Sequence, residues 1–347
     1  MIDRRDAEVA FAIPGDLDTR TGGYAYDRRL MAGLRDKGIS LRHLPWPGSF
    51  PYPTPGDLDL AALSLAAMPD NATVIIDGLA FGAMPGLAAA EGRRLRLVAL
   101  VHHPLALEPM APAEFVLSER DALRHARAVI ATSEATAHSL RETYGVLPER
   151  LVVAPPGTDP APPAVRRGDP PHVLSVGSVT PRKGHATLVA ALSALRDLSW
   201  RCTIVGSLDR APETVQALRV QINAQALQTR ITLAGEVEDT APLYAAADLF
   251  VLASLHEGYG MAFAEALACG LPVIGTLAGA IPATVPQDAG ALVPPEDSAA
   301  LAMALRRLLT DHAARERAAA AAWRAGAMLP KWESTAHTVA GLLHRLD

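Results

Sequence analysis

The sequence predicts an α/β protein with two Rossmann-like domains, each a doubly wound parallel sheet, and three observations support this fold class. Short apolar runs alternate with helical stretches twice along the chain, a pattern typical of parallel sheets covered by helices. Between the two alternations, residues 155–171 carry seven prolines and a few charges, which is the composition of an interdomain linker. The length of 347 residues favours two domains over one.

The first alternation predicts five buried strands, because each apolar run is short and bounded by turn-forming residues. Proline-rich loops separate them, notably residues 45–55. The expected strands are residues 8–13, 74–77, 97–102, 128–132 and 151–154.

The second alternation predicts six strands and the helices between them. One helix, residues 261–269, is followed by Gly270, where a left-handed C-cap would end it, and by Pro272, which prevents its continuation. A closing helix is expected within residues 323–346. The strands are residues 172–177, 200–206, 230–235, 249–254, 272–275 and 290–293, and the other helices are residues 184–195, 213–225, 240–247 and 298–310.

Composition excludes several classes of function. The formal net charge of −5 argues against a nucleic-acid partner, whose binding surface would be basic. Cys202 and Cys269 are the only cysteines and lie in apolar surroundings, so neither a disulfide framework nor a zinc site is expected. The charged start and the short apolar run at residues 9–13 do not make a signal core or a membrane span. We expect a cytoplasmic protein and leave open a peripheral contact with the inner face of the membrane.

Two carboxylates carry the chemistry of the stretch from residue 254 to residue 275. Glu257 lies in a glycine-containing loop and Glu265 on the following helix, and eight helical steps would separate them by about 12 Å. They therefore cannot share a proton, but they could hold two parts of one elongated ligand. The N–H groups of Gly260, Met261 and Ala262 at the helix start would suit a phosphate between them. A ligand with hydroxyls at both ends and phosphate in the middle is a nucleotide-sugar.

The same stretch resembles the donor-site signature of the retaining glycosyltransferases of family 4. The resemblance lies in Glu-Gly-Tyr-Gly at residues 257–260, a second Glu after seven intervening residues, and Ala-Cys-Gly-Leu-Pro-Val-Ile at residues 268–274. It implies the GT-B fold, in which two Rossmann-like domains face a central cleft. It further implies an acceptor-side domain at residues 1–165, a donor domain at residues 166–325 and a C-terminal helix at residues 326–347 that crosses back to the first domain.

The resemblance assigns roles to the residues of this stretch. Glu257 is expected at the donor sugar as a catalytic residue, Glu265 at the ribose, and Gly258 and Tyr259 in the donor-binding loop. Residues 279–283 read Gly-Ala-Ile-Pro-Ala where the family usually has Gly-Gly-x-Pro-Glu, so contacts of the second Gly and the Glu cannot be carried over.

A second segment, residues 177–185, follows a predicted strand and opens a helix. It is not a Walker A loop, but its backbone N–H groups and the cations Arg182 and Lys183 at a carboxyl edge suit a pyrophosphate. It resembles the family's Gly-Arg-x4-Lys-Gly segment, with Lys183 at the Lys and Ser178 at the usual Arg position. We expect Arg182 to supply the missing cation. With no Asp-x-Asp in a plausible loop, the resemblance implies no metal ion and no cofactor besides the donor.

Three further segments take catalytic or donor-binding roles from the resemblance. Gly22 and Gly23 follow the first strand, allow close approach of the backbone to a ligand, and match the family's first glycine-rich loop. His102, expected as the second catalytic residue beside Glu257, ends the strand at residues 97–102, where family members have a histidine that contacts the donor sugar, with His103 as the other choice. Glu236 and Val237 are expected near the nucleotide base.

These expectations describe a retaining, metal-independent glycosyltransferase. It would move a hexose from a UDP-, GDP- or ADP-sugar to a hydroxyl of a glycan, a lipid-linked saccharide or a small molecule. Ser178 and the altered segment at residues 279–283 keep open a non-catalytic scaffold or binding subunit of the same fold. A GT-B sugar phosphorylase or nucleotide-sugar epimerase is a further alternative, although no convincing lysine for a pyridoxal cofactor is present.

Overall fold

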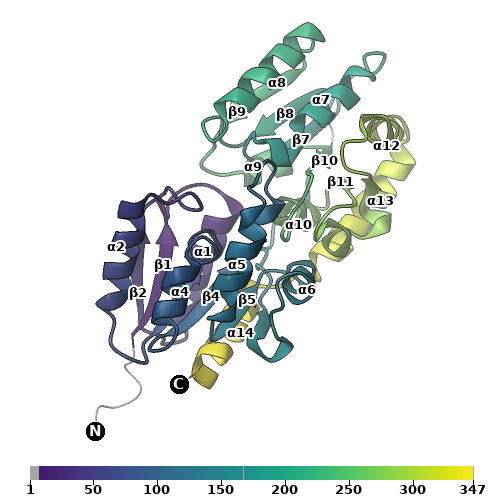
Figure 1. The fold of residues 1–347 in the computed structure, drawn as a ribbon. Coiled ribbons are helices and arrows are strands. Elements are labelled where there is room, and N and C mark those ends of the chain that lie inside the picture. Colours follow the sequence, from purple (N-terminus) through teal and green to yellow (C-terminus); the bar gives the residue numbers. More distant parts are fainter. Residues whose placement is uncertain (1–7, 167, 347) are drawn as a thin grey trace. The chain divides into compact units, whose positions relative to one another are not determined.

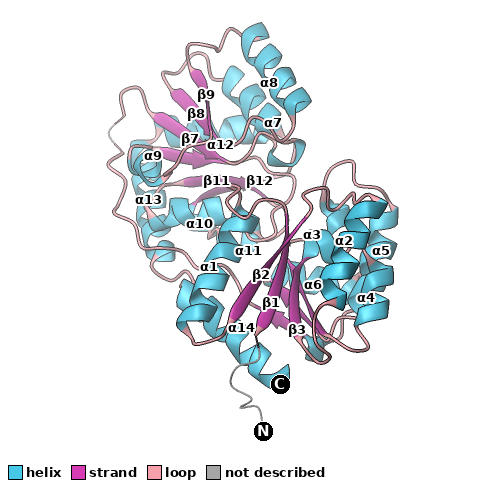
Figure 2. Ribbon diagram, turned by 90° about the vertical axis from the view of Figure 1, so that its left-hand side faces the viewer, coloured by secondary structure: helices cyan, strands magenta, loops and turns pink. Residues whose placement is uncertain are grey.

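The computed structural model describes residues 8–166 and 168–346, which form two compact units. Of the described residues, unit 1 comprises residues 8–157 and 330–346, and unit 2 comprises residues 158–166 and 168–329. Within the described residues each unit has one six-stranded parallel sheet with helices on both faces (Figures 1 and 2). The predicted fold class is therefore confirmed. The charged first residues of the chain lie outside the described residues.

The sheet of unit 1 has the strand order β2-β1-β3-β4-β5-β6. The chain changes its direction of travel across the sheet between β1 and β3, and open α/β sheets bind ligands at such a switch point. β1, β3 and β5 are buried at every residue because helices cover both faces of the sheet. The strands are β1 (Val9–Pro14), β2 (Leu41–Trp46), β3 (Thr73–Asp77), β4 (Arg96–Val101), β5 (Ala128–Ala131) and β6 (Leu151–Val153).

Two apolar clusters hold the helices of unit 1 against its sheet. One buries the side chains of Tyr26, Leu30 and Leu34 together with Val339 and Leu343, so the helix at the C-terminus packs beside the first helix. The other cluster lies on the opposite face of the sheet. The helices are α1 (Gly22–Asp36), α2 (Pro55–Ala66), α3 (Gly78–Phe81), α4 (Pro85–Glu91), α5 (Glu114–Arg124), α6 (Glu134–Glu142) and α14 (Trp332–Leu346).

The edge strand β2 lies partly inside the segment that the sequence predicts as a loop. β2 pairs only with β1, and its residue Pro45 is aligned with Ile13. A proline lacks the N–H that a central strand would donate, but an edge strand tolerates it. The prediction was wrong here because an edge strand alternates in burial and does not form a continuous apolar run.

The sheet of unit 2 has the order β12-β11-β10-β7-β8-β9, with its switch point between β10 and β7. All six predicted strands are present. The strands are β7 (His172–Val176), β8 (Arg201–Val205), β9 (Ile231–Gly235), β10 (Leu249–Val251), β11 (Val273–Thr276) and β12 (Gly290–Val293). The helices are α7 (His185–Ser193), α8 (Pro212–Ala224), α9 (Ala241–Ala245), α10 (Met261–Ala268), α11 (Ile281–Thr284), α12 (Ser298–Thr310) and α13 (His312–Gly326).

Two boundaries differ from the expected ones. The division into units falls after Gly157 and not near residue 165, because Ala164 is buried in a core of unit 2 and its N–H donates to the Cys269 carbonyl at 2.8 Å. The closing stretch is two helices, since α13 ends at Gly326 and α14 begins at Trp332. Pro330 lies between them and cannot continue a helix of the preceding chain.

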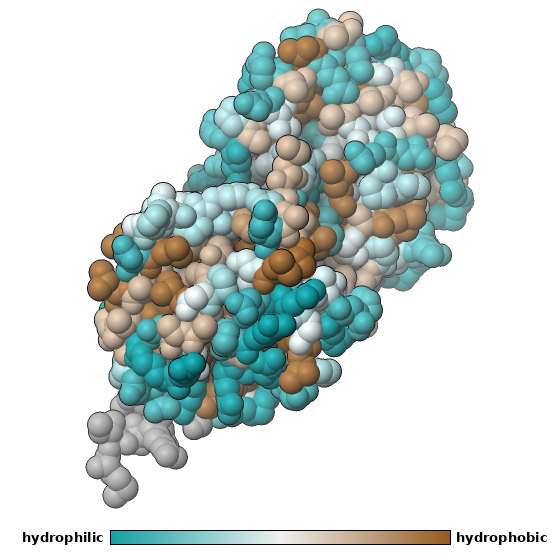
Figure 3. All heavy atoms as spheres, viewed as in Figure 1, coloured by the Kyte–Doolittle hydropathy of each residue, from teal (hydrophilic) through white to brown (hydrophobic). Residues whose placement is uncertain are grey.

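In the described part of the chain, no helix combines the length and hydropathy that crossing a bilayer requires. On the face shown in Figure 3, hydrophobic side chains are interspersed with hydrophilic ones. Large exposed apolar side chains of unit 1 include Tyr52, Leu60 and Leu63.

Candidate active site

The carboxylate of Glu257 lies in the loop after β10, beside the switch point of unit 2. Its Oε1 atom accepts hydrogen bonds from Lys183 Nζ and from Ser254 Oγ, both at 2.6 Å. Its Oε2 atom lies 3.5 Å from Arg182 Nη1. Glu257 is only 6% exposed, so these three side chains replace most of its hydration. We refer to the four residues as the Glu257 cluster.

The electrostatics of the Glu257 cluster keep its carboxylate charged. Burial alone would raise the pKa of Glu257, but Lys183, Arg182 and the hydrogen bond from Ser254 outweigh it and lower the pKa to about 2. Glu257 is therefore an anion at neutral pH. It can accept hydrogen bonds from hydroxyls and stabilise positive charge, but it has no proton to donate.

The loop after β7 brings the two cations to the end of β10. A short turn, Pro181–Lys183, leads into Gly184, which has φ 64°. A Cβ atom on Gly184 would overlap the carbonyl oxygen of Ala253, so only glycine allows this approach. The guanidinium of Arg182 donates to the His256 carbonyl at 2.8 Å and fixes the two loops together.

Gly279 supports Glu257 from the other side. The N–H of Ala280 donates to the Glu257 carbonyl at 2.9 Å, and Gly279 has φ 56°. A Cβ atom on Gly279 would overlap that same carbonyl. The segment that departs from the family pattern thus keeps the one glycine that the backbone of Glu257 requires.

The second carboxylate, Glu265, has a different set of partners. It lies half-buried on α10, and the Tyr244 hydroxyl hydrogen-bonds to it. Burial raises the pKa of Glu265 to about 7; the bond from Tyr244 opposes this rise and the nearby Asp159 adds to it. The two glutamates thus have separate partners. Glu257 is ionised at neutral pH, whereas the pKa of Glu265 lies near 7.

The other residues expected at the donor lie at the same edge of the sheet of unit 2. α10 begins after Gly260 in a left-handed conformation with no side-chain cap, and Gly258, Tyr259, Met261 and Ala262 are half-buried around its start. The other three lie in loops after neighbouring strands, and among the described residues no hydrogen bond joins them to the Glu257 cluster. They are Ser178 after β7, and the exposed Glu236 and half-buried Val237 after β9.

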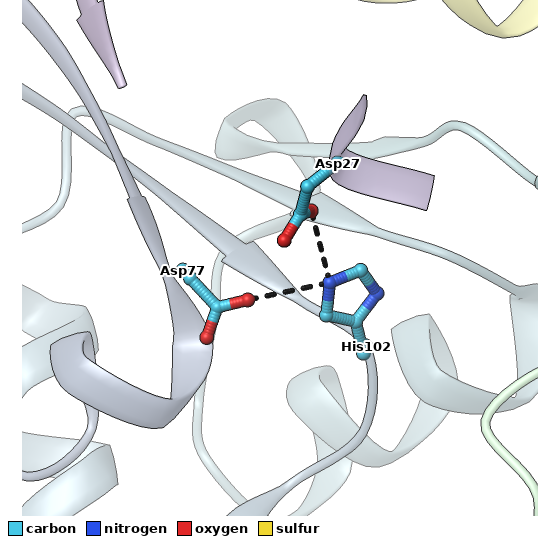
Figure 4. Close-up of side chains that lie close together, drawn as sticks. All are labelled: Asp27, Asp77 and His102. Carbon is cyan, nitrogen blue, oxygen red and sulfur yellow. Dashed lines mark hydrogen bonds and ion pairs between the residues drawn. The ribbon is translucent and has the colours of Figure 1, made fainter. Parts of the chain in front are cut away.

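Unit 1 has a corresponding cluster at its own switch point, drawn in Figure 4. The Nε2 atom of His102, just after β4, lies 3.2 Å from Asp27 Oδ1 and 3.4 Å from Asp77 Oδ2. Asp77 ends β3 and Asp27 lies on α1, so two elements bring carboxylates to one imidazole. The ring of Tyr26 contacts it edge-on, with 5.2 Å between centroids. We refer to Asp27, Asp77 and His102 as the His102 cluster.

The charges of the His102 cluster are the reverse of those around Glu257. Burial disfavours the imidazolium, but Asp27 and Asp77 outweigh it and raise the pKa of His102 to about 10. Burial raises the pKa of Asp27 to about 6, although His102 opposes that rise. The ligand-type atoms of the three residues lie within 4.8 Å of one another, and the hydrogen bonds of Nε2 account for this spacing. The independence from metal ions stays a prediction.

Of the other residues of unit 1 that were expected at the donor, Gly23 lies next to the His102 cluster and Gly22 and His103 do not belong to it. A Cβ atom on Gly23 would lie 3.6 Å from the His102 ring, so this glycine is next to the cluster, whereas Gly22 is exposed. His103 pairs with Glu108 at 2.7 Å and is not part of the cluster.

Sequence reasoning missed Asp27, Asp77, Ser254 and Tyr244. Asp77 could have been found, because it ends a strand next to the one that ends at His102, and parallel strands share a carboxyl edge. Asp27 and Tyr244 lie inside helices and carry no local signal, since their partners are far away in the sequence.

Solved structures share this architecture. The chain superposes on sucrose-phosphate synthase from Thermosynechococcus elongatus with a TM-score of 0.84 over 98% of both chains at 23% identity. The Anabaena protein HepE, solved in complex with UDP and glucose, gives a TM-score of 0.78 at 21% identity, over 97% of this chain and 99% of that one. The protein therefore has the two-domain GT-B fold.

The sequence comparisons give the family. Residues 4–162 match the family described as Glycosyltransferase Family 4, and residues 170–311 match Glycosyl transferases group 1. A D-inositol 3-phosphate glycosyltransferase from Xylanimonas cellulosilytica is 31% identical over 65% of this chain. The chain spans 58% of the length of that relative. The protein belongs to the family 4 glycosyltransferases.

Proposed function

We propose that the protein transfers a hexose from a nucleoside diphosphate sugar to an acceptor hydroxyl, with retention at the anomeric carbon and without a metal ion. The observation that carries the proposal is the buried carboxylate of Glu257, 2.6 Å from Lys183 at the switch point of unit 2. An ionised carboxylate beside a fixed cation offers one group for sugar hydroxyls and another for a diphosphate.

The reaction breaks the bond between the anomeric carbon and the diphosphate oxygen, which leaves with the electron pair. Lys183 and Arg182 would stabilise the negative charge that develops on the diphosphate, and fixed cations do this best where water is excluded. Glu257 would accept hydrogen bonds from the sugar and stabilise the positive charge on its ring. The acceptor oxygen then bonds to the anomeric carbon, and its proton passes to the departing diphosphate oxygen.

The remaining donor contacts follow from the same placement. We propose that Glu265 binds the ribose hydroxyls and that the start of α10 binds a phosphate, because helix N–H groups suit anions. Glu236 and Val237 would lie at the base. The acceptor would be a saccharide, a lipid-linked saccharide or a small molecule, and it would bind mainly to unit 1.

The named relatives supply the first compounds to test. Because the HepE structure holds UDP and glucose, UDP-glucose is the first donor. Because one relative is a D-inositol 3-phosphate glycosyltransferase, D-inositol 3-phosphate is the first acceptor. GDP- and ADP-sugars complete the donor set.

The test is a thermal-shift screen with UDP, GDP and ADP, followed by hydrolysis and transfer assays with the matching sugars in the presence and absence of EDTA. One nucleotide should raise the melting temperature, its sugar should be cleaved with or without EDTA, and NMR should show a retained anomeric configuration. Glu257→Gln should abolish turnover but not nucleotide binding. Asp197→Asn, which removes an exposed ion pair with Arg306, is the matched control. Binding without turnover for every donor would favour a scaffold subunit.

A further inference from the structure

We propose that Asp27 and Asp77 are positioning residues that clamp His102 as a permanent imidazolium, so that His102 acts as a hydrogen-bond donor and not as a general base. The role in the reaction rests on the proposed function. The clamp itself rests only on the geometry of unit 1.

The geometry begins with the use of a single ring nitrogen. Nε2 of His102 is within 3.4 Å of two carboxylate oxygens that come from different elements, as Figure 4 shows. Ionised carboxylates only accept hydrogen bonds, so Nε2 must carry a hydrogen. Two carboxylates at one nitrogen also repel each other unless a positive charge lies between them. The side chains of Asp27 and Asp77 are 1% and 5% exposed, so solvent screens little of that repulsion.

The other groups around the ring do not supply this charge. On α1, Arg28 acts on Asp27, but its guanidinium donates to the carbonyls of Leu17 and Thr19. On the segment after β4, His103 is paired with Glu108.

The elements behind the ring contribute neutral groups. The Thr132 hydroxyl donates to the His102 carbonyl at 3.0 Å, and Thr136 lies 3.4 Å from the same oxygen. The Tyr26 hydroxyl donates to the Ala154 carbonyl, and burial raises the pKa of Tyr26 far above its usual range. The imidazole is therefore the cation that the two carboxylates face.

Asp27 is the weaker half of the clamp. Its Oδ2 atom is buried without a hydrogen-bond partner among the described residues. Asp77, by contrast, uses its second oxygen to accept the N–H of Leu79 at 2.8 Å. This difference agrees with the raised pKa of Asp27, about 6.

The clamp determines what His102 can do for a substrate. With Nε2 directed at the carboxylates, Nδ1 is the nitrogen left for a ligand, and the side chain is 20% exposed. An imidazolium donates from both nitrogens and has no free lone pair. Nδ1 would then donate to a substrate hydroxyl or phosphate oxygen. The proton of the acceptor hydroxyl would have to go elsewhere, and in a same-face transfer the departing diphosphate oxygen can take it.

The first experiment needs no substrate. The full chain is labelled with 15N-histidine, and the ring nitrogens of His102, assigned with a His102→Gln variant, are followed from about pH 5 to about pH 10. His102 should remain protonated up to about pH 9, near its raised pKa. Asp27→Asn should lower the pKa of His102 by about one unit or more, because removing a nearby opposite charge typically shifts a pKa by that amount. Glu108→Gln, which removes the carboxylate next to His103, is the matched control and should leave His102 unchanged.

Asp77→Asn gives an independent second variant. An asparagine oxygen can still accept the N–H of Leu79, so the start of α3 is preserved while the charge is lost. Melting temperatures of both variants show whether they fold. A neutral His102 at pH 7 in the unmodified protein would overturn the clamp, and so would a bound divalent cation in place of the Nε2 proton, detected by elemental analysis.

The second experiment follows kcat and KM against pH with UDP-glucose, or with whichever sugar the donor screen identifies. If His102 must be charged, kcat of Asp77→Asn should fall as pH rises through the lowered pKa and recover at acid pH, with KM less affected. If His102 is a base, the same variant should gain activity at neutral pH, which contradicts the proposal. If no nucleotide-sugar is cleaved, the proposed function fails while the NMR titration still decides the clamp.

Discussion

Each unit places a cluster of charged side chains at the carboxyl edge of its sheet, near the switch point, but the central groups have opposite signs. In unit 2 a carboxylate, Glu257, is held by Lys183 and Arg182, and its pKa falls to about 2. In unit 1 a histidine, His102, is held by two aspartates, and its pKa rises to about 10. In each case the central group stays charged because two opposite charges lie next to it.

The comparison shows that neither cluster is balanced. Two cations and one anion leave unit 2 with a surplus of one positive charge, and two anions and one cation leave unit 1 with a surplus of one negative charge. A buried net charge is energetically costly unless an opposite charge compensates it. In unit 2 a bound diphosphate would compensate the positive charge. In unit 1 the excess negative charge lies on the buried Asp27, whose pKa is raised. In the proposed function, the positive surplus of unit 2 would therefore suit an anionic ligand, and His102 in unit 1 a ligand that accepts hydrogen bonds.

Removing the cation of unit 2 is expected to have the largest effect. Lys183→Met takes away the partner at 2.6 Å from Glu257 and the group that would stabilise the departing diphosphate. Turnover with the donor that the screen identifies should fall about 10²- to 10³-fold, since fixed groups of this kind contribute that much. The melting temperature should also fall, because one partner of a buried ion pair is lost.

Lys37→Met is the control for this change, because Lys37 follows the last turn of α1 and is outside both clusters. It should leave turnover and stability nearly unchanged. An equal loss of activity in both variants, or full activity in Lys183→Met, would show that the positive surplus of unit 2 is not used for the ligand.

A smaller effect is expected from Gly279→Ala, which tests whether the backbone placement of Glu257 matters as well as its charge. The new Cβ would overlap the Glu257 carbonyl and would sit at φ 56°, so the loop must shift. We expect a destabilisation of about 1–3 kcal/mol and a fall in turnover of about tenfold. Gly38→Ala is the matched control, because Gly38 has φ 81° but open space around it. If turnover fell equally in both variants, the effect of Gly279→Ala would come from backbone strain alone and not from displacement of Glu257.

Sequence alone was enough for most of the fold. Strands such as β4 and β10 are continuous apolar runs because helices cover both faces, and such runs stand out against polar loops. The edge strand β2 could not be found in this way, because its pattern of burial alternates and it contains Pro45. The break between α13 and α14 was missed although Pro330 marks it.

The candidate sites were predictable only where one segment carries the pattern. Glu257 and Glu265 share a loop and a helix, so their spacing could be recognised. The ion pair between Glu257 and Lys183 joins residues that are 74 positions apart, and no local pattern encodes it. The same applies to Asp27 and His102, which are 75 positions apart. Local patterns give the elements, whereas these contacts depend on how the strands are ordered.

A change at Glu265 sharpens the comparison within unit 2, because this carboxylate has a raised pKa and Glu257 a lowered one. The pKa of Glu265 rises from 4.5 to about 7, so the folded state holds its proton more tightly than the unfolded state does. The ionised side chain therefore costs stability as pH rises from about 4.5 to about 7. Glu265→Gln should raise the melting temperature by a few degrees, roughly 2–8 °C, at pH 8. The same variant should change little at pH 4.

Nucleotide affinity gives the second measurement on this variant. If Glu265 binds ribose, Glu265→Gln should weaken binding of the nucleotide found in the screen about tenfold even though the protein is more stable. Glu142→Gln, at the end of α6 in unit 1, is the control and should change neither quantity. A gain in stability at pH 4 equal to that at pH 8 would show that ionisation of Glu265 is not the cause.

The smallest effect is expected at Ser254, the neutral member of the Glu257 cluster. Ser254→Ala removes the hydroxyl that donates to Oε1 at 2.6 Å but leaves both cations, so Glu257 stays ionised at neutral pH. The loss should be about 1–2 kcal/mol, with a fall in turnover of a few-fold. The lowered pKa of Glu257 contributes its full stabilisation above the unfolded value of 4.5 and loses it progressively as pH falls to about 2, so the difference in stability should shrink over that range. Ser193→Ala, which removes a hydroxyl that donates to the Ala190 carbonyl within α7, should show no such pH dependence. If Ser254→Ala instead cost as much activity as Lys183→Met, hydrogen bonding and not charge would hold Glu257 in place, and the contrast of sign between the two units would lose its physical basis.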